Sequence, residues 1–286
     1  MCIIFGMRKI IDLHNDYLVE IKSNKKKVSY LNSKNMAAVN NILSAVWTSE
    51  LSSYWAMKRV EQASEFVKAF NKNEDYNLKL SLAVEDLHFY SKNNLDKIIN
   101  ISPTYCSLTW NSDNCLAGGA IEGGDLTTLG VEVINELENN NIQIDTAHLS
   151  ERSFMSFSMI TQKPMFCSHT AVASLNPHRR NLKDYQIKMI TESGGIIGIA
   201  FVNDFITQNK HAEVGDVAKH IDYIVSRFGD DYVCLGTDFF GTKNMPKRLK
   251  NYNDLNLLEE RLICLGYTQE IIDKIFYKNA ARFFNL

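Results

Sequence analysis

IQIDTAH (residues 142–148) and PMFCSH (residues 164–169) are two apolar runs that each end in a histidine. The residues between them, through Ile160, have the pattern of a helix. Parallel strands joined by a crossover helix present their C-terminal ends on the same side, so His148 and His169 can converge there. This stretch predicts one unit of an α/β barrel with a candidate metal site at its strand ends. A single histidine at a strand end is more often structural, so the rest of the chain has to support the ligand role.

A third histidine follows the first apolar run of the chain, in the sequence His14-Asn15-Asp16. Residues i and i+2 of an extended segment point to the same side, so His14 and Asp16 can bind one cation together. The alternative is a turn that carries two polar residues. Because two more histidines follow at later strand ends, we favour the ligand role.

Carboxylates occur at two further strand ends. Residues 78–84 form an apolar run that leads to Glu85 and Asp86, and residues 232–237 lead to Asp238. A carboxylate beside a His-x-Asp site can bridge two cations, and we assign this role to Glu85. The alternative is a pair of helix N-cap residues, an interpretation that we favour for Asp86. Asp238 can contact a metal weakly and handle the proton of a metal-bound water.

Strand-like runs alternate with helical patterns along the whole chain. The strand-like runs cover residues 10–16, 37–48, 78–84, 105–109, 142–148, 164–169, 196–200 and 232–237. The helical patterns cover residues 55–70, 127–139, 149–160, 183–191, 214–228, 254–265 and 268–276. The candidate polar residues lie at the C-terminal ends of strands or in the loops that follow. The pattern predicts an α/β protein, a single (β/α)8 TIM barrel spanning residues 1–286, with a metal site at the C-terminal ends of the strands.

Two loops are candidates for contact with a substrate. Residues 176–181 form a turn that carries Arg179 and Arg180. The planar fork of arginine matches a carboxylate, so we assign Arg180 to a substrate carboxylate, a surface arginine being the alternative. The run 105–109 opens into Trp110-Asn111 and a loop with glycines at 118, 119, 123 and 124. These glycines lack the spacing of a phosphate-binding loop, so we expect a mobile or closely packed loop over the site.

The composition argues against several classes of partner. A net charge of −2 over 286 residues gives no basic field for nucleic acid, and Lys25-Lys26-Lys27 is typical of a solvated loop. The six cysteines are scattered and are expected to be small buried residues of a reducing compartment, without thiol chemistry. The apolar residues 1–6 are too short for a signal peptide, and no apolar run approaches the roughly 20 residues that span a bilayer. We expect a cytoplasmic protein without a membrane or nucleic-acid partner.

In this order and spacing, the motifs resemble the membrane dipeptidase (renal dipeptidase) family, zinc peptidase family M19, among the amidohydrolase-like metal-dependent hydrolases. The resemblance covers nearly the whole chain. It rests on Asp12-Leu13-His14-Asn15-Asp16, on Leu126-Thr127 through Gly130, on Asp145-Thr146-Ala147-His148-Leu149-Ser150, on Phe166-Cys167-Ser168-His169-Thr170, on Arg179-Arg180-Asn181-Leu182 and on Gly236-Thr237-Asp238-Phe239-Phe240-Gly241.

The resemblance implies a dinuclear zinc site. In it His14 and Asp16 bind one Zn2+, His148 and His169 bind the second, and Glu85 bridges the two. Asp238 would be the general base and acid near the first metal, and Arg180 would hold the carboxylate of a dipeptide. Two cations that share a hydroxide lower the pKa of the parent water and polarise the scissile carbonyl, which suits peptide hydrolysis.

The chain also departs from the family pattern. Where animal members place a histidine after a Leu-Thr pair, this chain has Trp110, whose indole donates one hydrogen bond but carries no charge. Bacterial relatives with Leu-Thr-Trp-Asn are similar, so Trp110 and Asn111 are interpreted as substrate-binding residues of a subfamily. Asp86 follows Glu85 in place of a glycine, and Glu122 is a rival for the bridging role. The chain lacks the secretory segment, cysteine pattern and anchor of the animal enzymes, so membrane attachment is not expected. A homodimer is expected by analogy alone.

Three functions are consistent with these residues. The first is a zinc-dependent dipeptidase that hydrolyses dipeptides through a metal-bridging hydroxide. The second is an amidohydrolase that acts on another small amide or on a peptide containing a D-residue. The third is a barrel that binds metal or peptide without turnover. Five residues of ligand type at matched strand ends argue against the third function, because a chain freed from metal chemistry has no physical need for them.

Overall fold

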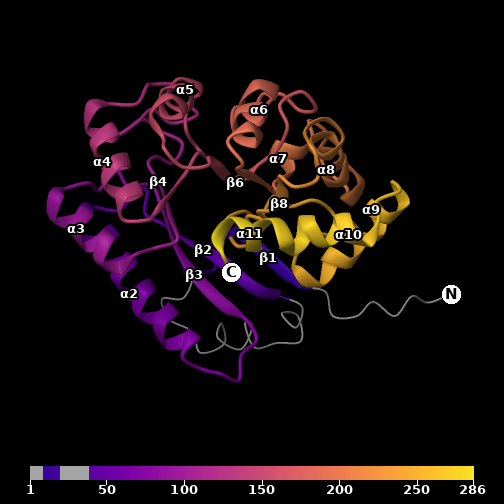
Figure 1. The fold of residues 1–286 in the computed structure, drawn as a ribbon, viewed down its shortest axis with the longest axis horizontal. Helices are drawn as coiled ribbons and strands as arrows, with labels where there is room; N and C mark the ends of the chain where they lie inside the picture. The colour runs from indigo at the N-terminus through magenta and orange to yellow at the C-terminus, as the bar shows by residue number, and fades with distance from the viewer. Residues whose placement is uncertain (1–8, 20–38) are drawn as a thin grey trace.

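The computed structural model describes residues 9–19 and 39–286. Eight parallel strands form a closed barrel in sequence order, and Asp12 of the first strand pairs with Leu235 of the last. The strands are β1 (Ile10–Asn15), β2 (Val39–Trp47), β3 (Lys79–Glu85), β4 (Tyr105–Ser107), β5 (Gln143–Asp145), β6 (Phe166–Thr170), β7 (Ile196–Ile199) and β8 (Val233–Leu235) (Figure 1). The predicted (β/α)8 barrel is confirmed.

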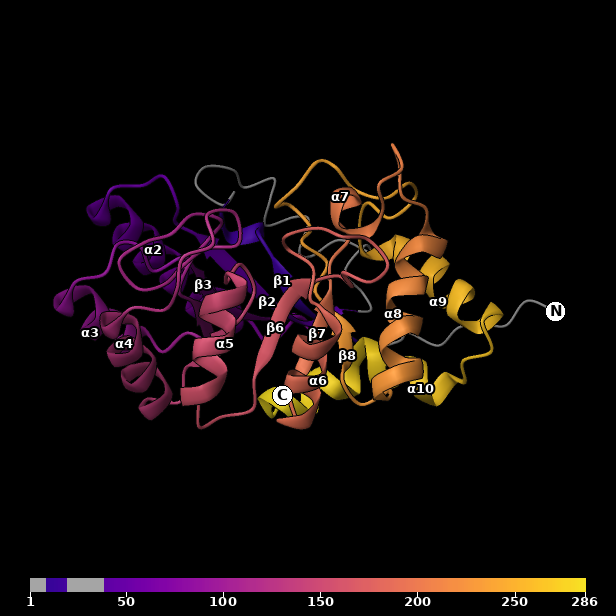
Figure 2. The same ribbon diagram turned by 90° about the horizontal axis from the view of Figure 1, so that it is seen from above.

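Helices cover the outside of the barrel. They are α2 (Ser53–Asn71), α3 (Lys92–Ile101), α4 (Thr128–Asn139), α5 (Glu151–Ile160), α6 (Asp184–Glu192), α7 (Asn203–Ile206), α8 (Val214–Phe228), α9 (Leu255–Cys264), α10 (Gln269–Asp273) and α11 (Asn279–Phe284). In Figure 1, α2, α3 and α4 lie along one side of the molecule and α8, α9 and α10 along the other. Figure 2 shows α6 and α8 outside β7 and β8, where α6 packs against β7 and α8 packs against both strands.

Most strands end one to three residues earlier than the apolar runs predict, whereas β3 and β6 end one residue later. The run 142–148 is a strand only over β5, because the Asp145 side chain accepts a hydrogen bond from the backbone N–H of Ala147 at 3.0 Å. Such an aspartate turn ends the ladder and leaves His148 on the loop that follows it. Strand β5 therefore leads the chain toward the end of the barrel, and the loop after it carries the candidate ligand His148.

Three helices were missed by the sequence analysis, namely α3, α11 and the four-residue α7. Helix α3 begins after Ser91, whose side chain accepts a hydrogen bond from the N–H of Asn94 at 3.1 Å, and it buries only Leu95 and Ile98. A helix with so small an apolar face has a weak periodic signal. Helix α11 packs the rings of Phe283 and Phe284 against Phe166, with centroid distances of 5.8 and 5.4 Å. Because Phe166 is the first residue of β6, α11 covers the barrel end opposite the strand C-termini.

The interior of the barrel is filled by side chains from several strands. The buried interior set comprises Ile11, Leu13, Leu43, Ala45, Ala83, Tyr105, Phe166, Ile196, Cys234 and Ala280. A second and larger apolar cluster fills the layer between strands and helices. The interior is therefore a packed core and not a pore.

Other predictions have mixed outcomes. Cys106, Cys167 and Cys234 are buried as expected, but Cys115 and Cys264 are exposed, so the expectation of buried cysteines was wrong for these two. The predictions for Lys25-Lys26-Lys27, for Cys2 and for residues 1–6 lie outside the described residues. Within residues 9–19 and 39–286, no helix has both the length and the apolar character needed to cross a bilayer.

Candidate metal centre

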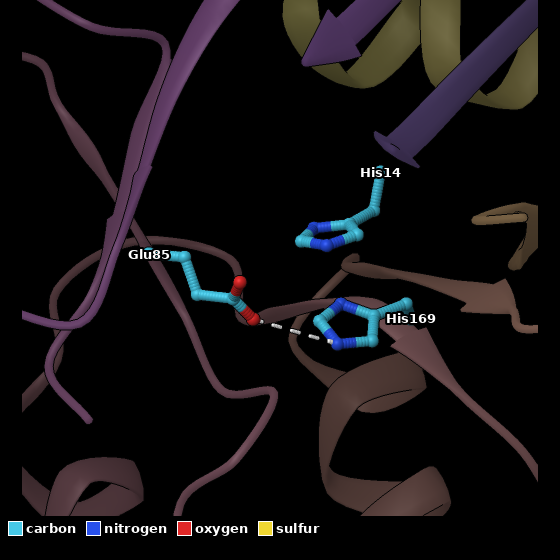
Figure 3. A group of neighbouring side chains, drawn as sticks. All are labelled: His14, Glu85 and His169. Carbon is cyan, nitrogen blue, oxygen red and sulfur yellow. Dashed lines mark ion pairs between the residues drawn. The ribbon is translucent and has the colours of Figure 1, made fainter. Parts of the chain in front are cut away.

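The strand ends bring together the six residues that were proposed as ligands or as the proton carrier. His14 and Asp16 come from β1 and its exit, Glu85 from β3, His148 from the loop after β5, His169 from β6 and Asp238 from the loop after β8. Figure 3 shows His14, Glu85 and His169 converging on a common point from three separate strands. All six are buried except Asp238, which is partly exposed.

One group of donors gathers around His14. Its Nε2 lies 3.5 Å from Oδ2 of Asp16 and 3.9 Å from Oδ1 of Asp238. Ligand atoms of these three residues all lie within 4.8 Å of one another. Among the residues that the structure describes, Nε2 of His14 has no hydrogen-bond partner. A buried ring nitrogen that faces two carboxylates without a hydrogen bond is the arrangement expected around a cation.

A second group gathers around Glu85. Its Oε1 lies 2.9 Å from Nε2 of His148 and 3.8 Å from Nε2 of His169, the contact drawn as a dashed line in Figure 3. The two Nε2 atoms are 3.0 Å apart. Glu85 and His169 also form a group with His14 within 4.8 Å, and the His14 and His169 rings stack at 3.7 Å. Glu85 is therefore the carboxylate that reaches both groups.

Hydrogen bonds to the outer ring nitrogens fix the tautomers of His148 and His169. Ser168 donates its hydroxyl proton to Oδ2 of Asp145 at 2.5 Å, so its oxygen accepts from Nδ1–H of His169 at 2.7 Å. Nδ1–H of His148 donates to Oδ1 of Asn111 at 3.0 Å. In both imidazoles, Nε2 is therefore the nitrogen without a proton. Such outer contacts commonly orient metal-binding histidines.

The donor set fits divalent cations. Two Nε2 lone pairs at 3.0 Å repel each other and cannot share a hydrogen bond when both protons sit on Nδ1. A cation between them would convert this repulsion into attraction. Imidazole nitrogens together with carboxylate oxygens are ligands that Zn2+ accepts. The residues around Glu85 and those around His14 are thus suited to hold metal ions.

The electrostatics of the centre point to the same conclusion. Burial would lower the pKa of His14, but the adjacent Asp16 carboxylate and the nearby charge of Glu85 raise it to about 10. Burial raises the pKa of Asp238 to about 8, with a further increase from Asp16. Burial lowers the pKa of His169, which stays neutral. The buried carboxylates therefore favour positive charge at His14, and a bound cation supplies such charge.

Several residues at the strand ends have left-handed backbones. The φ angles are 68° at His148, 59° at Asp238 and 73° at Asp86. Residues other than glycine rarely adopt this conformation, and each instance costs about 1–3 kcal/mol unless the surroundings hold it. The backbone N–H of Asp238 donates to the carbonyl of His14 at 3.0 Å, which is one such restraint. The conformation turns the chain sharply where it must aim a side chain into the centre.

Asp86 does not cap a helix, which corrects the favoured interpretation. Helix α3 has Ser91 as its N-cap, and the Asp86 carboxylate instead accepts hydrogen bonds from the hydroxyl of Ser49, from Asn114 Nδ2 at 3.0 Å and from the N–H of His88 at 2.9 Å. The left-handed backbone at Asp86 explains why a glycine suits this position in the family pattern. Here the carboxylate contacts stabilise the same backbone without a glycine.

A cavity of about 790 Å³ opens onto the candidate metal ligands. Arg180 lines it with a buried guanidinium, which donates from Nη2 to Nε2 of His169 at 2.8 Å. Trp110 also lines the cavity, with its ring centroid 6.0 Å from that of His148. Asn111 lines it too, and its side-chain oxygen holds His148. Each residue proposed for substrate contact therefore faces this space.

The loop over the site is closely packed. Oδ1 of Asp113 accepts hydrogen bonds from the N–H of Gly119 at 2.8 Å and of Gly124 at 3.2 Å. The exposed Glu122 accepts from the N–H of Asp113 at 2.8 Å, which places it in the loop rather than among the ligands. The structure thus favours the packed loop over the mobile one and removes Glu122 as a rival of Glu85.

The sequence analysis missed the residues that support the ligands from behind. Tyr105 contacts His14, and Ser168 and Asp145 hold His169. Asp12 accepts from the N–H of Thr237 at 2.8 Å and ties β1 to β8 below Asp238. Tyr105 has the character of a core residue in the sequence, but Asp12 and Asp145 are carboxylates inside apolar runs. That placement is a signal for a buried polar contact.

Comparisons with known proteins agree with this geometry. Residues 32–286 match the family model of the membrane dipeptidases, peptidase family M19. The match begins after β1, so it does not include His14 and Asp16. A likeness in fold also extends to a metallo peptidase from Rhodobacter sphaeroides, whose structure holds a phosphinate mimic of the dipeptide L-Ala-D-Ala. The two structures share a TM-score of 0.88 at 17% identity, over 98% of this chain and 99% of the other.

Curated relatives match shorter parts of the chain. An uncharacterised protein from the pqqA 5′ region of Klebsiella pneumoniae is 31% identical over 169 residues, which are 58% of this chain and 62% of that protein. An uncharacterised dipeptidase of Schizosaccharomyces pombe is 31% identical over 212 residues, 70% of this chain and 50% of that protein. The chain thus spans about half to two thirds of the length of these relatives. Because the family model covers most of the chain, this protein belongs to the membrane dipeptidase family, peptidase family M19.

Proposed function

We propose that this protein is a zinc-dependent dipeptidase that holds two Zn2+ ions. The observation that carries the proposal is the approach of the His148 and His169 Nε2 atoms to 3.0 Å, beside a carboxylate that reaches both ligand groups. His14 and Asp16 would bind the first zinc and His148 and His169 the second, with Glu85 between them. Together the two ions would supply a hydrolytic water of lowered pKa and polarise the scissile carbonyl.

Asp238 is the proposed general base and acid. Its side chain is 14% exposed, against 9% for Asp16 and 5% for Glu85, so it is the carboxylate of the centre most open to the cavity. It can therefore accept a proton from the attacking water and deliver it to the leaving amine. Burial holds the pKa of Asp238 close to neutrality, which suits a group that both takes and gives a proton.

Arg180 is the proposed contact for the C-terminal carboxylate of the substrate. The guanidinium is buried, and among the described residues its Nε has no hydrogen-bond partner. A buried donor without a partner costs free energy, and a substrate carboxylate would satisfy it. The Arg180 Nη2 contact with His169 places the bound carboxylate close to the second ligand group.

Trp110 and Asn111 are the proposed wall of the substrate pocket. The indole of Trp110 packs edge-on against Trp47 at 5.5 Å between ring centroids, so the two rings form one apolar surface. Asn111 contributes through His148, which it orients. A rigid aromatic wall selects among side chains by shape, so the pocket would discriminate between dipeptides by size and by stereochemistry at the C-terminal residue.

Dipeptides with a C-terminal D-residue are a second candidate substrate class. The R. sphaeroides metallo peptidase of the same fold holds a mimic of L-Ala-D-Ala. This chain has the same fold, but its substrate need not be the same, because a shared fold does not define substrate specificity. Both stereoisomers therefore belong in the test of function.

The deciding experiment is hydrolysis of a dipeptide panel by zinc-reconstituted protein. The panel carries L- or D-residues at the C-terminal position, and each reaction is run before and after chelation, with the zinc content counted. We expect cleavage of at least one member, loss of cleavage with the chelator, and two zinc ions per chain. Protein that holds two ions but cleaves no member would contradict the dipeptidase proposal and favour another small amide or a binding role.

Location and assembly stay predictions. A cytoplasmic location can be checked by fractionation of cells that produce the protein, and the homodimer by the mass of the protein in solution. The net charge of −2 supports the expectation that nucleic acid is not a partner.

A further inference from the structure

We propose that Glu50 binds the free α-ammonium group of the substrate, so that the enzyme selects small peptides with an unblocked N-terminus. This inference rests on the proposed dipeptidase function and adds a specificity residue to it. Glu50 lies just after β2, and its exposed side chain lines the cavity that contains the candidate metal centre.

Glu50 is an acidic residue of the cavity that does not belong to the candidate metal centre. The acidic side chains that line the cavity are Asp16, Glu50, Glu85 and Asp238. Three of them face the imidazoles of the centre, so Glu50 is the one acidic group of this lining, within the described chain, that stands apart from the ligands. A zwitterionic peptide presents one cation and one anion. The cavity therefore offers Glu50 for the first and the buried Arg180 for the second.

The barrel order places these two groups on opposite walls. Glu50 follows β2 and Arg180 follows β6, and in the closed barrel three strands separate β2 from β6 in either direction. The candidate ligands come from β1, β3, β5, β6 and β8, around the space between those walls. A dipeptide has a single peptide bond between its charged ends. If the ammonium end of the dipeptide bound Glu50 and the carboxylate end bound Arg180, the peptide bond would lie over the candidate metal ligands.

Hydrogen bonds hold the residues on both sides of Glu50 in its turn. The N–H and the hydroxyl of Thr48 donate to the carbonyl of Glu85 at 3.1 and 3.0 Å, and the hydroxyl of Ser49 donates to the Asp86 carboxylate. On the other side, His88 Nε2 contacts the carbonyl of Leu51 at 2.9 Å. The turn is thereby tied to the strand end that presents Glu85, which keeps Glu50 at a defined place relative to the metal ligands.

The backbone of Glu50 supports a functional rather than a surface role. Its φ of 68° lies in the left-handed region, at the third residue of a turn closed by the N–H of Leu51 and the carbonyl of Thr48 at 3.2 Å. Glycine or asparagine is the usual residue at such a position. A glutamate at such a position in a cavity wall is strained, and strained residues of this kind cluster at binding sites.

The test compares wild type with Glu50→Gln and Glu50→Ala on two substrates, a dipeptide that the wild type cleaves and its N-acetyl derivative. The control is Glu65→Gln, a change at an exposed glutamate of α2 outside the cavity. We expect the wild type to prefer the free dipeptide by about 10- to 100-fold in kcat/KM, the range for one hydrogen-bonded charge. Both Glu50 variants should lose most of that preference through a higher KM for the free dipeptide, with unchanged rates on the N-acetyl derivative. Zinc content and Glu65→Gln should match the wild type.

Two results would overturn this inference while leaving the dipeptidase function intact. One is a wild type that cleaves the free and acetylated dipeptides equally well. The other is a Glu50 variant that loses the same factor on both substrates, which would indicate a structural role for the residue. A zinc-loaded wild type that cleaves neither substrate nor any other dipeptide would instead overturn the proposed function, and this inference with it.

Discussion

The hydroxyl of Tyr105 lies 3.0 Å from Nδ1 of His14 and donates its own proton to the carbonyl of Leu13, also at 3.0 Å. Its oxygen can therefore only accept from Nδ1–H of His14. This leaves Nε2 of His14 directed at Asp16 and Asp238, where a cation would displace any proton that Nε2 carries. A core tyrosine of β4 thus sets the tautomer of a candidate ligand on β1.

Replacing Tyr105 with phenylalanine should weaken metal binding at the His14 group. The ring is fully buried and phenylalanine retains it, so we expect the fold to survive with a loss of about 1 kcal/mol in the free energy of unfolding. Loss of an outer contact of a ligand typically costs about 10- to 100-fold in metal affinity. The measurement is a zinc titration against a competing chelator. The control is Tyr277→Phe, at a partly buried tyrosine just before α11 that packs against the barrel interior. Unchanged affinity would show that Tyr105 does not orient His14.

Replacing Asp238 with asparagine should remove turnover while zinc remains bound. The substitution keeps the shape of the side chain but removes a group that can take up and deliver a proton. We expect kcat to fall by at least about 100-fold, the usual contribution of a general base. The readouts are kcat on a cleaved dipeptide and the zinc content of the same sample. Turnover close to wild type would contradict the proton-transfer role of Asp238.

Much of this site could be predicted from the sequence, because the ligands lie where apolar runs end. His14, Glu85, His148 and His169 were proposed from that position alone, and the structure brings them together. The supporting residues were not predictable in the same way. Tyr105 lies inside a strand, and its hydroxyl reaches the centre only because the closed barrel brings β4 within reach of β1.

The error at Asp86 has a similar origin. A carboxylate after a strand and before a helix is a common N-cap, so local pattern favoured that interpretation. The actual partners, Ser49 and Asn114, come from loops after β2 and β4 and are distant in sequence. Contacts between neighbouring loops of a barrel depend on the order of its strands. The local sequence pattern around Asp86 carries no information on that order.

Replacing Gly241 with alanine should disturb the His14 group without unfolding the protein. A Cβ at this position would lie 2.2 Å from Oδ2 of Asp16 and 2.2 Å from Oδ1 of Asp238. The methyl group must therefore displace one or both carboxylates, and misplacement of a reacting group by about 1 Å can cost roughly 100-fold in rate. We expect a comparable fall in kcat/KM with a nearly unchanged melting temperature. Gly215→Ala, in α8, serves as a control for stability, because the nearest atoms to a Cβ there belong to the flexible end of the Arg261 side chain.

Replacing His88 with glutamine should give a stability loss that depends on pH. The Asp86 carboxylate, 3.2 Å from Nδ1 of His88, raises the pKa of the imidazole above its ordinary 6.5, with burial opposing. A raised pKa in the folded state means that protonated His88 stabilises the fold. That stabilisation is fully present below about pH 6.5, the value in the unfolded chain, and is lost as the pH rises through the higher pKa of the folded state.

The measurement is urea unfolding of wild type and His88→Gln at pH 6 and pH 9.5, with chelator in both so that metal binding does not contribute. Glutamine can still donate to the carbonyl of Leu51, so the comparison isolates the charge. The His88 side chain is 25% exposed, and solvent screening reduces the effect to about 0.5–1 kcal/mol at pH 6. At pH 9.5 the two proteins should approach equal stability. A difference that stays constant across this range would show that the charged pair of His88 and Asp86 does not hold the turn that presents Glu50.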